Sequence, residues 1–411
     1  MNNAIFQFDY PENEPVKSYS PGTRERKALS AELDRLSAEV ADIPLIIGGK
    51  EVRTGDTGTV VMPHNHQHKL AVYHKAGEKE VKMAIEAAIK AHRNWAEISW
   101  VERLSISLKI AELISKKYRA LINASTMLGQ SKNVLQAEID AACETIDFLR
   151  FNAHYISDIY NDQPHSESGI VNRIEYRPIE GFIFAVTPFN FTAIASNLNM
   201  SPAVMGNTLL WKPATTAILS NYFLMKIFQE AGLPDGVINF IPGQGSVIGN
   251  ATMSDYHYAG LHFTGSNITF NHLWQTSAAN LAKYRSYPKI VGETGGKDFV
   301  LVHNSANSEE VATALVRGAF EYQGQKCSAA SRAYIPESMW PAVKERMLDA
   351  LAQITLGDVR QFSNFMNAVI DEKAFDNIMD YINKAKTSSE ATILYGGNGD
   401  KSTGYFIEPT V

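Results

Sequence analysis

The chain of 411 residues is long enough for two to three average domains with full hydrophobic cores. Hydrophobic residues make up 45% of it and charged residues 20%, which excludes intrinsic disorder and collagen-like repeats. The formal net charge of -6 provides no positive field for nucleic acid or anionic lipid. No apolar run approaches the length of a membrane span. We therefore expect a small-molecule substrate, with neither nucleic acid nor membrane as a partner.

Cysteine content and the first residues bear on the compartment. The chain has two cysteines, Cys143 and Cys327, which suits a reducing compartment and leaves room for one reactive thiol. Residues 1–20 resemble neither a signal peptide nor a typical transit peptide. We expect a cytoplasmic protein, or one of the mitochondrial matrix if the source is a eukaryote.

The first part of the chain is predicted to be mainly helical. Helical spacing of leucines over 22–40 predicts an amphipathic helix within an N-terminal arm, residues 1–43. Residues 44–52 read as a short hairpin around a Gly-Gly turn. Three further helices are predicted over 80–95, 99–117 and 135–155. We expect these three helices to pack together as one group.

The middle of the chain changes to strands. An alternating segment within 161–177 predicts an exposed hairpin strand that projects or bridges. Three apolar runs follow, each with a turn and a helical stretch after it, over 181–186, 207–211 and 237–241. This rhythm predicts βαβ units and a parallel sheet, whose ligands bind at the carboxyl ends of the strands.

A second block begins near Gly295. It is predicted to contain a buried strand at 299–302, a helix at 308–323 and another strand at 331–335. The last residues, 404–411, read as an extended apolar strand that ends abruptly.

Two short segments carry residues suited to catalysis. Cys327 follows the predicted helix in a loop of small residues, where a thiolate could act as nucleophile. On composition alone a buried structural cysteine is the commoner interpretation, and Cys143, in a helix among alanines, fits that role. Glu293 lies in the segment Val291-Gly-Glu-Thr-Gly-Gly-Lys-Asp298, whose glycines would let its carboxylate reach a water as general base. The alternative for this segment is a simple turn.

Together these segments resemble the glutamate and cysteine signatures of the aldehyde dehydrogenase superfamily, and the resemblance extends over nearly all of the chain from Pro44 onward. It implies an α/β fold with a Rossmann-like parallel-sheet cofactor domain, an α/β catalytic domain and a bridging hairpin. The implied boundaries are 44–160 and 178–292 for the NAD-binding domain, 161–177 for the hairpin and 293–411 for the catalytic domain. Family members continue past Val411, so we expect a C-terminally truncated, incomplete catalytic domain that is inactive or aggregation-prone when expressed alone.

The resemblance also assigns roles to single residues. Asn190, in Thr187-Pro-Phe-Asn-Phe191, would form an oxyanion hole with the backbone N–H of Cys327, although it could also be a helix N-cap. The implied cofactor is NAD, with NADP less expected. Its implied contacts are Thr187, Pro188, Phe189, Lys212, Thr264, Gly265, Ser266 and Gly292. Lys212 would bind the adenosine ribose, and Ser266 would bind the pyrophosphate at a helix N-terminus. No metal is implied.

Three stretches, 127–142, 144–152 and 325–332, are similar to the L-glutamate γ-semialdehyde (1-pyrroline-5-carboxylate) dehydrogenase branch of the superfamily. This similarity implies NAD-dependent oxidation of that semialdehyde to L-glutamate in proline catabolism, through a cysteine thiohemiacetal and thioester. Ser328 would hold the substrate α-carboxylate, and Phe191 would line the passage for the aliphatic part of the substrate. The alternative for Ser328 is a small residue that fills space, and the alternative for Phe191 is an aromatic residue of the core. The alternatives are another aldehyde or semialdehyde dehydrogenase, including a CoA-acylating one, or an inactive fragment with a binding role. The implied protein partners are further copies of the chain, in a homodimer or larger oligomer, and transiently proline dehydrogenase.

Overall fold

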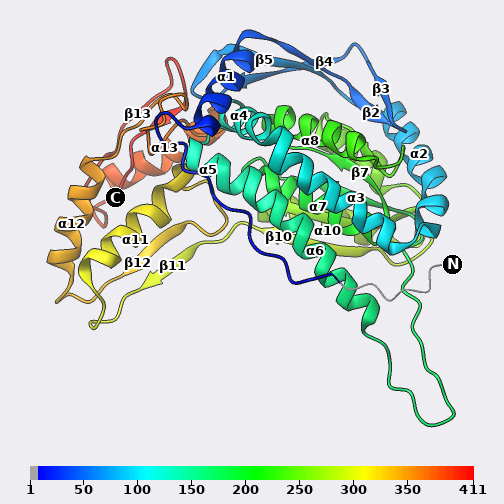
Figure 1. The fold of residues 1–411 in the computed structure, drawn as a ribbon. Helices are drawn as coiled ribbons and strands as arrows, with labels where there is room; N and C mark the ends of the chain where they lie inside the picture. Colours follow the sequence, from blue (N-terminus) through cyan, green and yellow to red (C-terminus); the bar gives the residue numbers. More distant parts are fainter. Residues whose placement is uncertain (1–7) are drawn as a thin grey trace.

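The computed structural model describes residues 8–411, and its centre is a seven-stranded sheet (Figure 1). The strand order is β10-β9-β6-β7-β8-β2-β3. Strands β10 to β8 in this order are parallel, and β2 and β3 add an antiparallel hairpin at the edge. The bounds are β2 Leu45–Ile47, β3 Lys50–Val52, β6 Phe182–Val186, β7 Thr208–Lys212, β8 Ile238–Phe240, β9 Tyr258–Gly265 and β10 Lys289–Thr294. The predicted hairpin, βαβ units and parallel sheet are confirmed.

Helices cover both faces of this sheet, because successive side chains of a buried strand point to opposite sides. Ile183 and Ala185 of β6 pack into one core, whereas Phe182 and Phe184 pack into the other. The first face is covered by α1 Arg24–Ala38, α3 Trp100–Leu113, α4 Arg119–Gln130, α6 Glu144–Asn161, α7 Thr192–Val204 and α8 Ile218–Ala231. The second is covered by α2 Glu78–Glu97, α9 Gly245–Met253 and α10 Asn267–Ala279. None of the helices between residues 8 and 411 has the length and apolar character needed to cross a membrane.

The three predicted helices are present, but they do not form one group. The segment 135–155 is helical through α5 Val134–Ala137, the π-helix η2 Glu138–Cys143 and α6. Helix α3 packs against α6, whereas α2 packs on β7, β6, β8 and α9 across the sheet. The expectation of a single group was wrong because the apolar face of α2, including Val81 and Ala88, is buried against the sheet.

The described part of the N-terminal arm lies along the helices of the first face. Helix α1 begins after its N-cap Thr23, and its buried residues Leu29, Leu33 and Leu36 face the core that α4 also lines. Residues 1–7 of the predicted arm lie outside the described residues. A separate sheet of order β1-β5-β4 follows, formed by β1 Ala41–Ile43, β4 Thr57–Met62 and β5 Asn65–His74.

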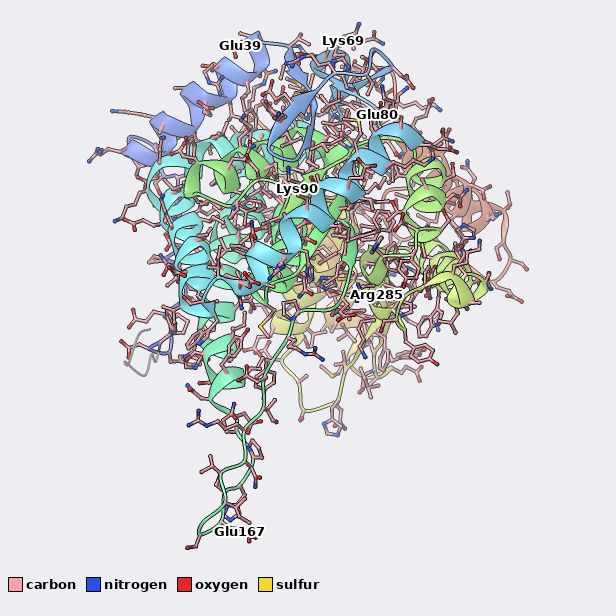
Figure 2. All side chains as sticks on the ribbon, turned by 90° about the vertical axis from the view of Figure 1, so that its right-hand side faces the viewer. Glu39, Lys69, Glu80, Lys90, Glu167 and Arg285 are labelled. Carbon is pink, nitrogen blue, oxygen red and sulfur yellow. The ribbon has the colours of Figure 1, made fainter. Side chains whose placement is uncertain are left out.

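Residues 162–177 form a loop that projects from the body, with Glu167 near its tip (Figure 2). Within this range no strand is formed, contrary to the prediction. The two arms are joined largely by side chains: Gln163 Oε1 accepts from the Ile174 N–H at 2.9 Å, and Asn172 Nδ2 donates to the His165 carbonyl at 2.7 Å. Side-chain bonds replace the backbone ladder that a hairpin strand requires.

The C-terminal block lies beside the end of the sheet (Figure 1, yellow to red). It contains β11 Asp298–Leu301, α11 Ser308–Phe320, the 3-10 helix η5 Glu321–Gly324, β12 Ala330–Tyr334, α12 Trp340–Ala352, α13 Glu372–Thr387, β13 Gly399–Asp400 and β14 Phe406–Ile407. Strands β11 and β12 pair in parallel, and β13 and β14 pair antiparallel.

Three details of this block differ from the sequence-based expectations. The strand at 299–302 is not buried as predicted, because Phe299 and Leu301 on one face are 62% and 74% exposed. The helix from Ser308 ends at Phe320, before a left-handed turn, and does not reach residue 323. Strand β10 continues through Glu293 to Thr294, so the cofactor sheet crosses the boundary expected after Gly292.

Candidate active site

Cys327 and Glu293 meet where the C-terminal block touches the parallel sheet. Glu293 is the second-to-last residue of β10, and Cys327 lies in the loop between η5 and β12. The Cys327 thiol donates a hydrogen bond to Glu293 Oε1 across 3.2 Å. Burial raises the pKa of this thiol, and the hydrogen bond and charge of Glu293 raise it further. The arrangement is a protonated nucleophile beside a carboxylate that can accept its proton.

A left-handed turn leads into the nucleophile loop. Tyr322, Gln323 and Gly324 have φ values of 50°, 56° and 69°, which only glycine adopts easily. The buried Tyr322 hydroxyl donates to the Gln130 carbonyl at 2.8 Å, and Gln323 Nε2 donates to the Ala368 carbonyl at 2.8 Å. These contacts hold two strained non-glycine residues, and so fix the path of the chain into Cys327.

Asn190 lies beside the same loop. Its Nδ2 donates to the carbonyl of Gln325 at 2.9 Å, two residues before the nucleophile. Phe191 occupies the N-cap position of α7, so the alternative of Asn190 as N-cap was wrong. The structure thus places a side-chain amide next to the nucleophile loop, and its role in an oxyanion hole stays a prediction.

The eight predicted cofactor residues gather at the carboxyl edge of four adjacent strands. Thr187, Pro188 and Phe189 follow β6, Lys212 ends β7, Thr264, Gly265 and Ser266 end or follow β9, and Gly292 lies near the end of β10. Ligands of open parallel sheets bind at this edge. Ser266 is the N-cap of α10 and is exposed, which leaves that helix N-terminus open to an anion.

Lys212 is the predicted cofactor residue whose side chain has no task within the described protein. Burial lowers the pKa of its ammonium. Among residues 8–411, no hydrogen bond or ion pair joins this ammonium to another side chain or carbonyl. Lys212 is half-buried at the end of β7, so its ammonium is free to donate to a ligand at this edge of the sheet.

Other predicted cofactor residues have structural tasks in the protein itself. The Thr187 hydroxyl accepts from Trp211 Nε1 at 3.0 Å. A Cβ at Gly292 would lie 2.2 Å from the Phe270 ring, and one at Gly265 would lie 2.7 Å from the Phe263 ring. These glycines therefore make room for aromatic packing behind the site.

A cavity of about 410 Å³ opens beside Glu293. Four of the predicted site residues line it, namely Glu293, Phe191, Thr264 and Gly292. The lining also includes Glu144, Phe148, Ile194, Asn197, Leu198, His262, Phe263 and Val291, which sequence reasoning missed. Ser328 is exposed and is not part of this lining. Its predicted contact with the substrate carboxylate stays a prediction.

Two patterns could have revealed part of the missed wall. Glu144 and Phe148 are four residues apart on α6 and so share one helix face. His262 and Thr264 alternate on β9 and so share one sheet face, next to Val291 and Glu293 of β10.

Two titratable residues in the wall of this cavity have shifted pKa values. Burial and the nearby Asp140 raise the pKa of Glu144 to about 7. The His262 Nδ1–H donates to the Leu198 carbonyl at 2.9 Å, while burial lowers the pKa of that ring.

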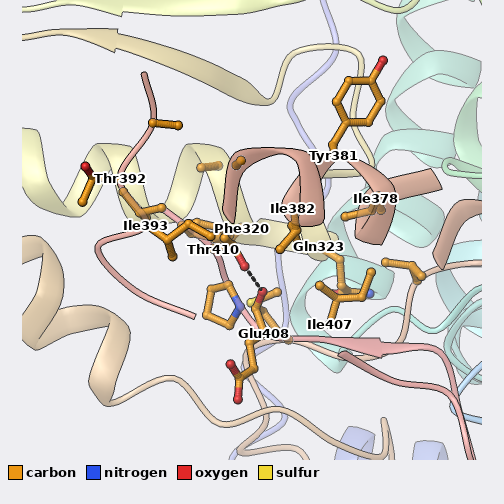
Figure 3. A pocket seen from close by; sticks show the side chains of 17 residues that line it. Phe320, Gln323, Ile378, Tyr381, Ile382, Thr392, Ile393, Ile407, Glu408 and Thr410 are labelled. Carbon is orange, nitrogen blue, oxygen red and sulfur yellow. Dashed lines mark hydrogen bonds between the residues drawn. The ribbon is translucent and has the colours of Figure 1, made fainter. Parts of the chain in front are cut away.

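A second cavity, of about 430 Å³, lies in the C-terminal block and is drawn in Figure 3. Its wall is mainly apolar, with Phe320 of α11, Ile378 and Ile382 of α13, and Ile393 and Ile407 from the last segment. It contains none of the predicted catalytic or cofactor residues. The cavity beside Glu293 is therefore the candidate substrate site.

Cys143 is less accessible than Cys327 and lies away from the sheet edge where the predicted cofactor residues gather. It is buried, and its Sγ contacts Arg119 Nη2 at 3.2 Å and Glu138 Oε1 at 3.7 Å. Burial raises the pKa of its thiol to about 12. The predicted structural role of Cys143 fits this environment.

Comparison with known proteins identifies the family to which this fold belongs. The chain belongs to the aldehyde dehydrogenase family, whose model matches residues 52–411. It is similar to delta-1-pyrroline-5-carboxylate dehydrogenases, so the resemblance to this branch is confirmed. The mitochondrial enzyme of Dictyostelium discoideum is 47% identical over 404 residues, which cover 98% of this chain and 72% of that protein. The human mitochondrial enzyme is 46% identical over 400 residues, covering 97% and 71%.

A solved structure extends this likeness to three dimensions. The delta-pyrroline-5-carboxylate dehydrogenase of Mycobacterium tuberculosis, bound with NAD, superposes with a TM-score of 0.98 at 46% identity. The match covers 100% of this chain and 77% of that one. The fold predicted from the sequence, that of the aldehyde dehydrogenases, is confirmed.

Proposed function

We propose that this protein oxidises L-glutamate γ-semialdehyde, which forms from 1-pyrroline-5-carboxylate, to L-glutamate with NAD in proline catabolism. The contact between Cys327 and Glu293 carries the proposal, because it supplies a nucleophile and a base at one point. The choice of substrate is supported by relatives at 46–47% identity that are named for 1-pyrroline-5-carboxylate.

The first step is attack of Cys327 on the aldehyde carbon. The thiol proton passes to Glu293, which already accepts its hydrogen bond, and a carbon–sulfur bond forms. Negative charge then develops on the former carbonyl oxygen. The Asn190 amide and the Cys327 N–H stabilise that charge, an effect worth about 3–4 kcal/mol in comparable sites.

The cofactor fits the edge of the sheet on two observations, the unpartnered Lys212 ammonium and the open N-terminus of α10 at Ser266. Lys212 would hold the adenosine ribose, and Ser266 with its neighbours Thr264 and Gly265 would hold the pyrophosphate and nicotinamide. NAD, when bound, supplies the acceptor for the hydride that leaves the carbon attached to Cys327. A free 2′-hydroxyl on the ribose, and therefore NAD over NADP, is part of this proposal.

The last step releases the acid. Glu293 is exposed, so it can pass the first proton to solvent and then take a proton from the attacking water. Water adds to the thioester carbon, the carbon–sulfur bond breaks, and Cys327 leaves as thiolate. Phe191, in the wall of the cavity, would contact the aliphatic part of the substrate, and Ser328 would hold its α-carboxylate.

The test is the formation of NADH and free glutamate from glutamate semialdehyde. A preparation that turns over is expected to form both without coenzyme A, its Cys327→Ala variant is expected to form neither, and its Cys143→Ala variant serves as the matched thiol control that retains activity. Full activity in Cys327→Ala would overturn the proposal. Product that appears only as an acyl-CoA would replace it with the acylating class.

We also infer an assembly of like subunits in which residues 162–177 bridge, since this loop projects away from the body of the chain. Deleting the loop should lower the mass of the assembly in light scattering. Transient contact with proline dehydrogenase, which would pass on its product, is part of the same proposal.

A further inference from the structure

Two lysines share one carboxylate behind the nucleophile loop. Lys132 is fully buried, and its Nζ donates to Asp140 Oδ2. Lys326, the residue before Cys327, places its Nζ 3.5 Å from the same oxygen. Asp140 is 3% exposed, so its charge interacts with these groups with little screening by solvent.

Both ammonium groups also lie over the ring of Phe191. The Nζ of Lys132 is 4.2 Å from the ring centroid, and that of Lys326 is 5.6 Å away. Lys132 Nζ lies 4.3 Å from the centroid of Tyr322, the first left-handed residue of the turn before the loop. The cluster therefore contacts the loop from both ends, at Tyr322 and at Lys326.

The local backbone aims Asp140 into this cluster. Asp140 lies in the π-helix η2, where an extra residue per turn changes the direction of side chains, a feature often found at functional sites. One ammonium would be enough to neutralise a buried carboxylate. The second lysine, which also lies 3.6 Å from Glu321 Oε2, is adjacent in sequence to the nucleophile, so Asp140 links the buried Lys132 to the nucleophile loop.

We propose that Asp140 is a positioning residue for the nucleophile: by holding the Lys326 ammonium, it fixes the backbone that carries the Cys327 thiol. This deepens the proposed function and rests on it only for the identity of Cys327 as the nucleophile. Asp140 acts through Lys326 and need not touch the substrate or the cofactor.

The test uses alkylation of Cys327 by iodoacetamide without aldehyde, in a Cys143→Ala background that leaves a single thiol. The rate is divided by the fraction of thiol that is ionised at each pH, and the constant value that this ratio has while the lysines are still protonated, the plateau, reports the position of the sulfur. We expect Asp140→Asn and Lys326→Gln each to change the plateau by about threefold or more, with no added effect of Asp140→Asn in the Lys326→Gln background. In turnover, kcat should fall by about tenfold in Asp140→Asn while the dissociation constant of NAD stays constant.

Two further variants keep the outcome interpretable. Asp140→Asn leaves Lys132 buried without a counter-ion, which can lower the thermal midpoint, whereas Lys132→Met with Asp140→Asn removes both buried charges. This double variant should have the same plateau rate of Cys327 alkylation as Lys326→Gln. As a matched control, Asp380→Asn breaks the exposed pair of Asp380 with Lys384 at 2.6 Å and should leave the plateau unchanged.

A parent-like plateau in folded Asp140→Asn or in the double variant would overturn the proposal. Independent effects of Asp140→Asn and Lys326→Gln would do the same. Because alkylation needs no aldehyde, a protein that shows the coupling but does not oxidise glutamate semialdehyde would contradict the proposed substrate and leave the positioning role intact.

Discussion

The Sγ of Cys327 lies 3.2 Å from Oε1 of Glu293, although 34 residues separate them and they belong to different parts of the fold. Glu293 is fixed by the register of β10 with β9, in which it pairs with Thr264. Cys327 is fixed by the turn that follows α11. The contact between nucleophile and base therefore depends on how the C-terminal block sits against the end of the parallel sheet.

Replacing Glu293 by Gln should separate its two effects. The carboxylate raises the pKa of the Cys327 thiol by its charge and hydrogen bond, so Glu293→Gln should lower that pKa and speed alkylation near neutral pH. Turnover should fall by about 10²–10⁴-fold, because the base for hydrolysis is lost. The measurements are the pH dependence of iodoacetamide alkylation and the steady-state rate of NADH formation. A thiol pKa that rises in this variant would contradict the account.

Removing the Asn190 amide should lower kcat by about 10²–10³-fold, as for other oxyanion-hole donors. Asn190→Ala deletes the donor, and Asn190→Asp keeps the shape but places an acceptor beside the developing charge. Both should retain the affinity for NAD, measured by fluorescence titration. An Asp variant with wild-type kcat would contradict a role for the Asn190 amide in stabilising the developing charge, because Asp donates neither to that charge nor to the Gln325 carbonyl.

Lys212→Ala should weaken NAD binding by about tenfold, since one hydrogen bond from a charged donor is lost. The rate of Cys327 alkylation without cofactor should not change, because Lys212 ends β7, which two other strands separate from β10 and Glu293. Lys226→Ala is the matched control: Lys226 lies 3.5 Å from Glu51 at the surface. Equal loss of NAD affinity in both variants would rule out a specific role for Lys212.

Glu144 should make the protein less stable as pH rises. Its pKa is raised from 4.5 to about 7 by burial and by Asp140, so the folded chain binds more protons than the unfolded chain between these values. The free energy of unfolding then decreases with pH through this window. Glu144→Gln should therefore be more stable than wild type in urea at about pH 8, with a difference that shrinks toward about pH 5.

Glu112 supplies the control for that measurement, because it is an exposed glutamate on α3 paired with Lys116 and its pKa is lowered. Glu112→Gln should give no gain in stability at the higher pH. A Glu144→Gln variant with the same stability difference at both pH values would show that its carboxyl does not titrate differently in the folded state.

Gly324→Ala should destabilise the turn before the nucleophile. Gly324 has a φ of +69°, and a Cβ there would lie 2.8 Å from the Ala319 carbonyl. A left-handed alanine costs about 1–2 kcal/mol before any clash is counted. Gly245→Ala, at a helical glycine with open space around it, should change the free energy of unfolding in urea far less. Equal stability of the two variants would contradict the strain in this turn.

The parallel sheet and the catalytic pair were predictable because their signals are local in sequence. Apolar runs such as 181–186 alternate with helical stretches, and the segments around Glu293 and Cys327 are short motifs rich in small residues. Each such signal can be read without knowing what else packs nearby.

The features that were not predicted depend on contacts between distant segments. Nothing in the order of residues indicates that Lys132 and Lys326 share an oxygen atom of Asp140, because their approach depends on a π-helical turn and on the packing of the C-terminal block. Tyr322 and Gln323 adopt left-handed φ values that their residue types disfavour, so tertiary contacts decide their conformation. The side of the sheet on which α2 packs likewise depends on its contacts with β6, β7, β8 and α9, which are distant in sequence.

The left-handed turn also decides which parts of this enzyme can be exchanged with those of a relative. Its hydroxyl and amide contacts end on the carbonyls of Gln130 and Ser131, at the C-terminal end of α4, and on that of Ala368. A chimera that takes only the C-terminal block from another family member would bring in a nucleophile loop whose contacts match the 130–133 segment of that relative and not the one in this chain. Recombination points that keep 130–133 together with 322–327 should therefore yield working hybrids more often than a cut at the apparent domain boundary.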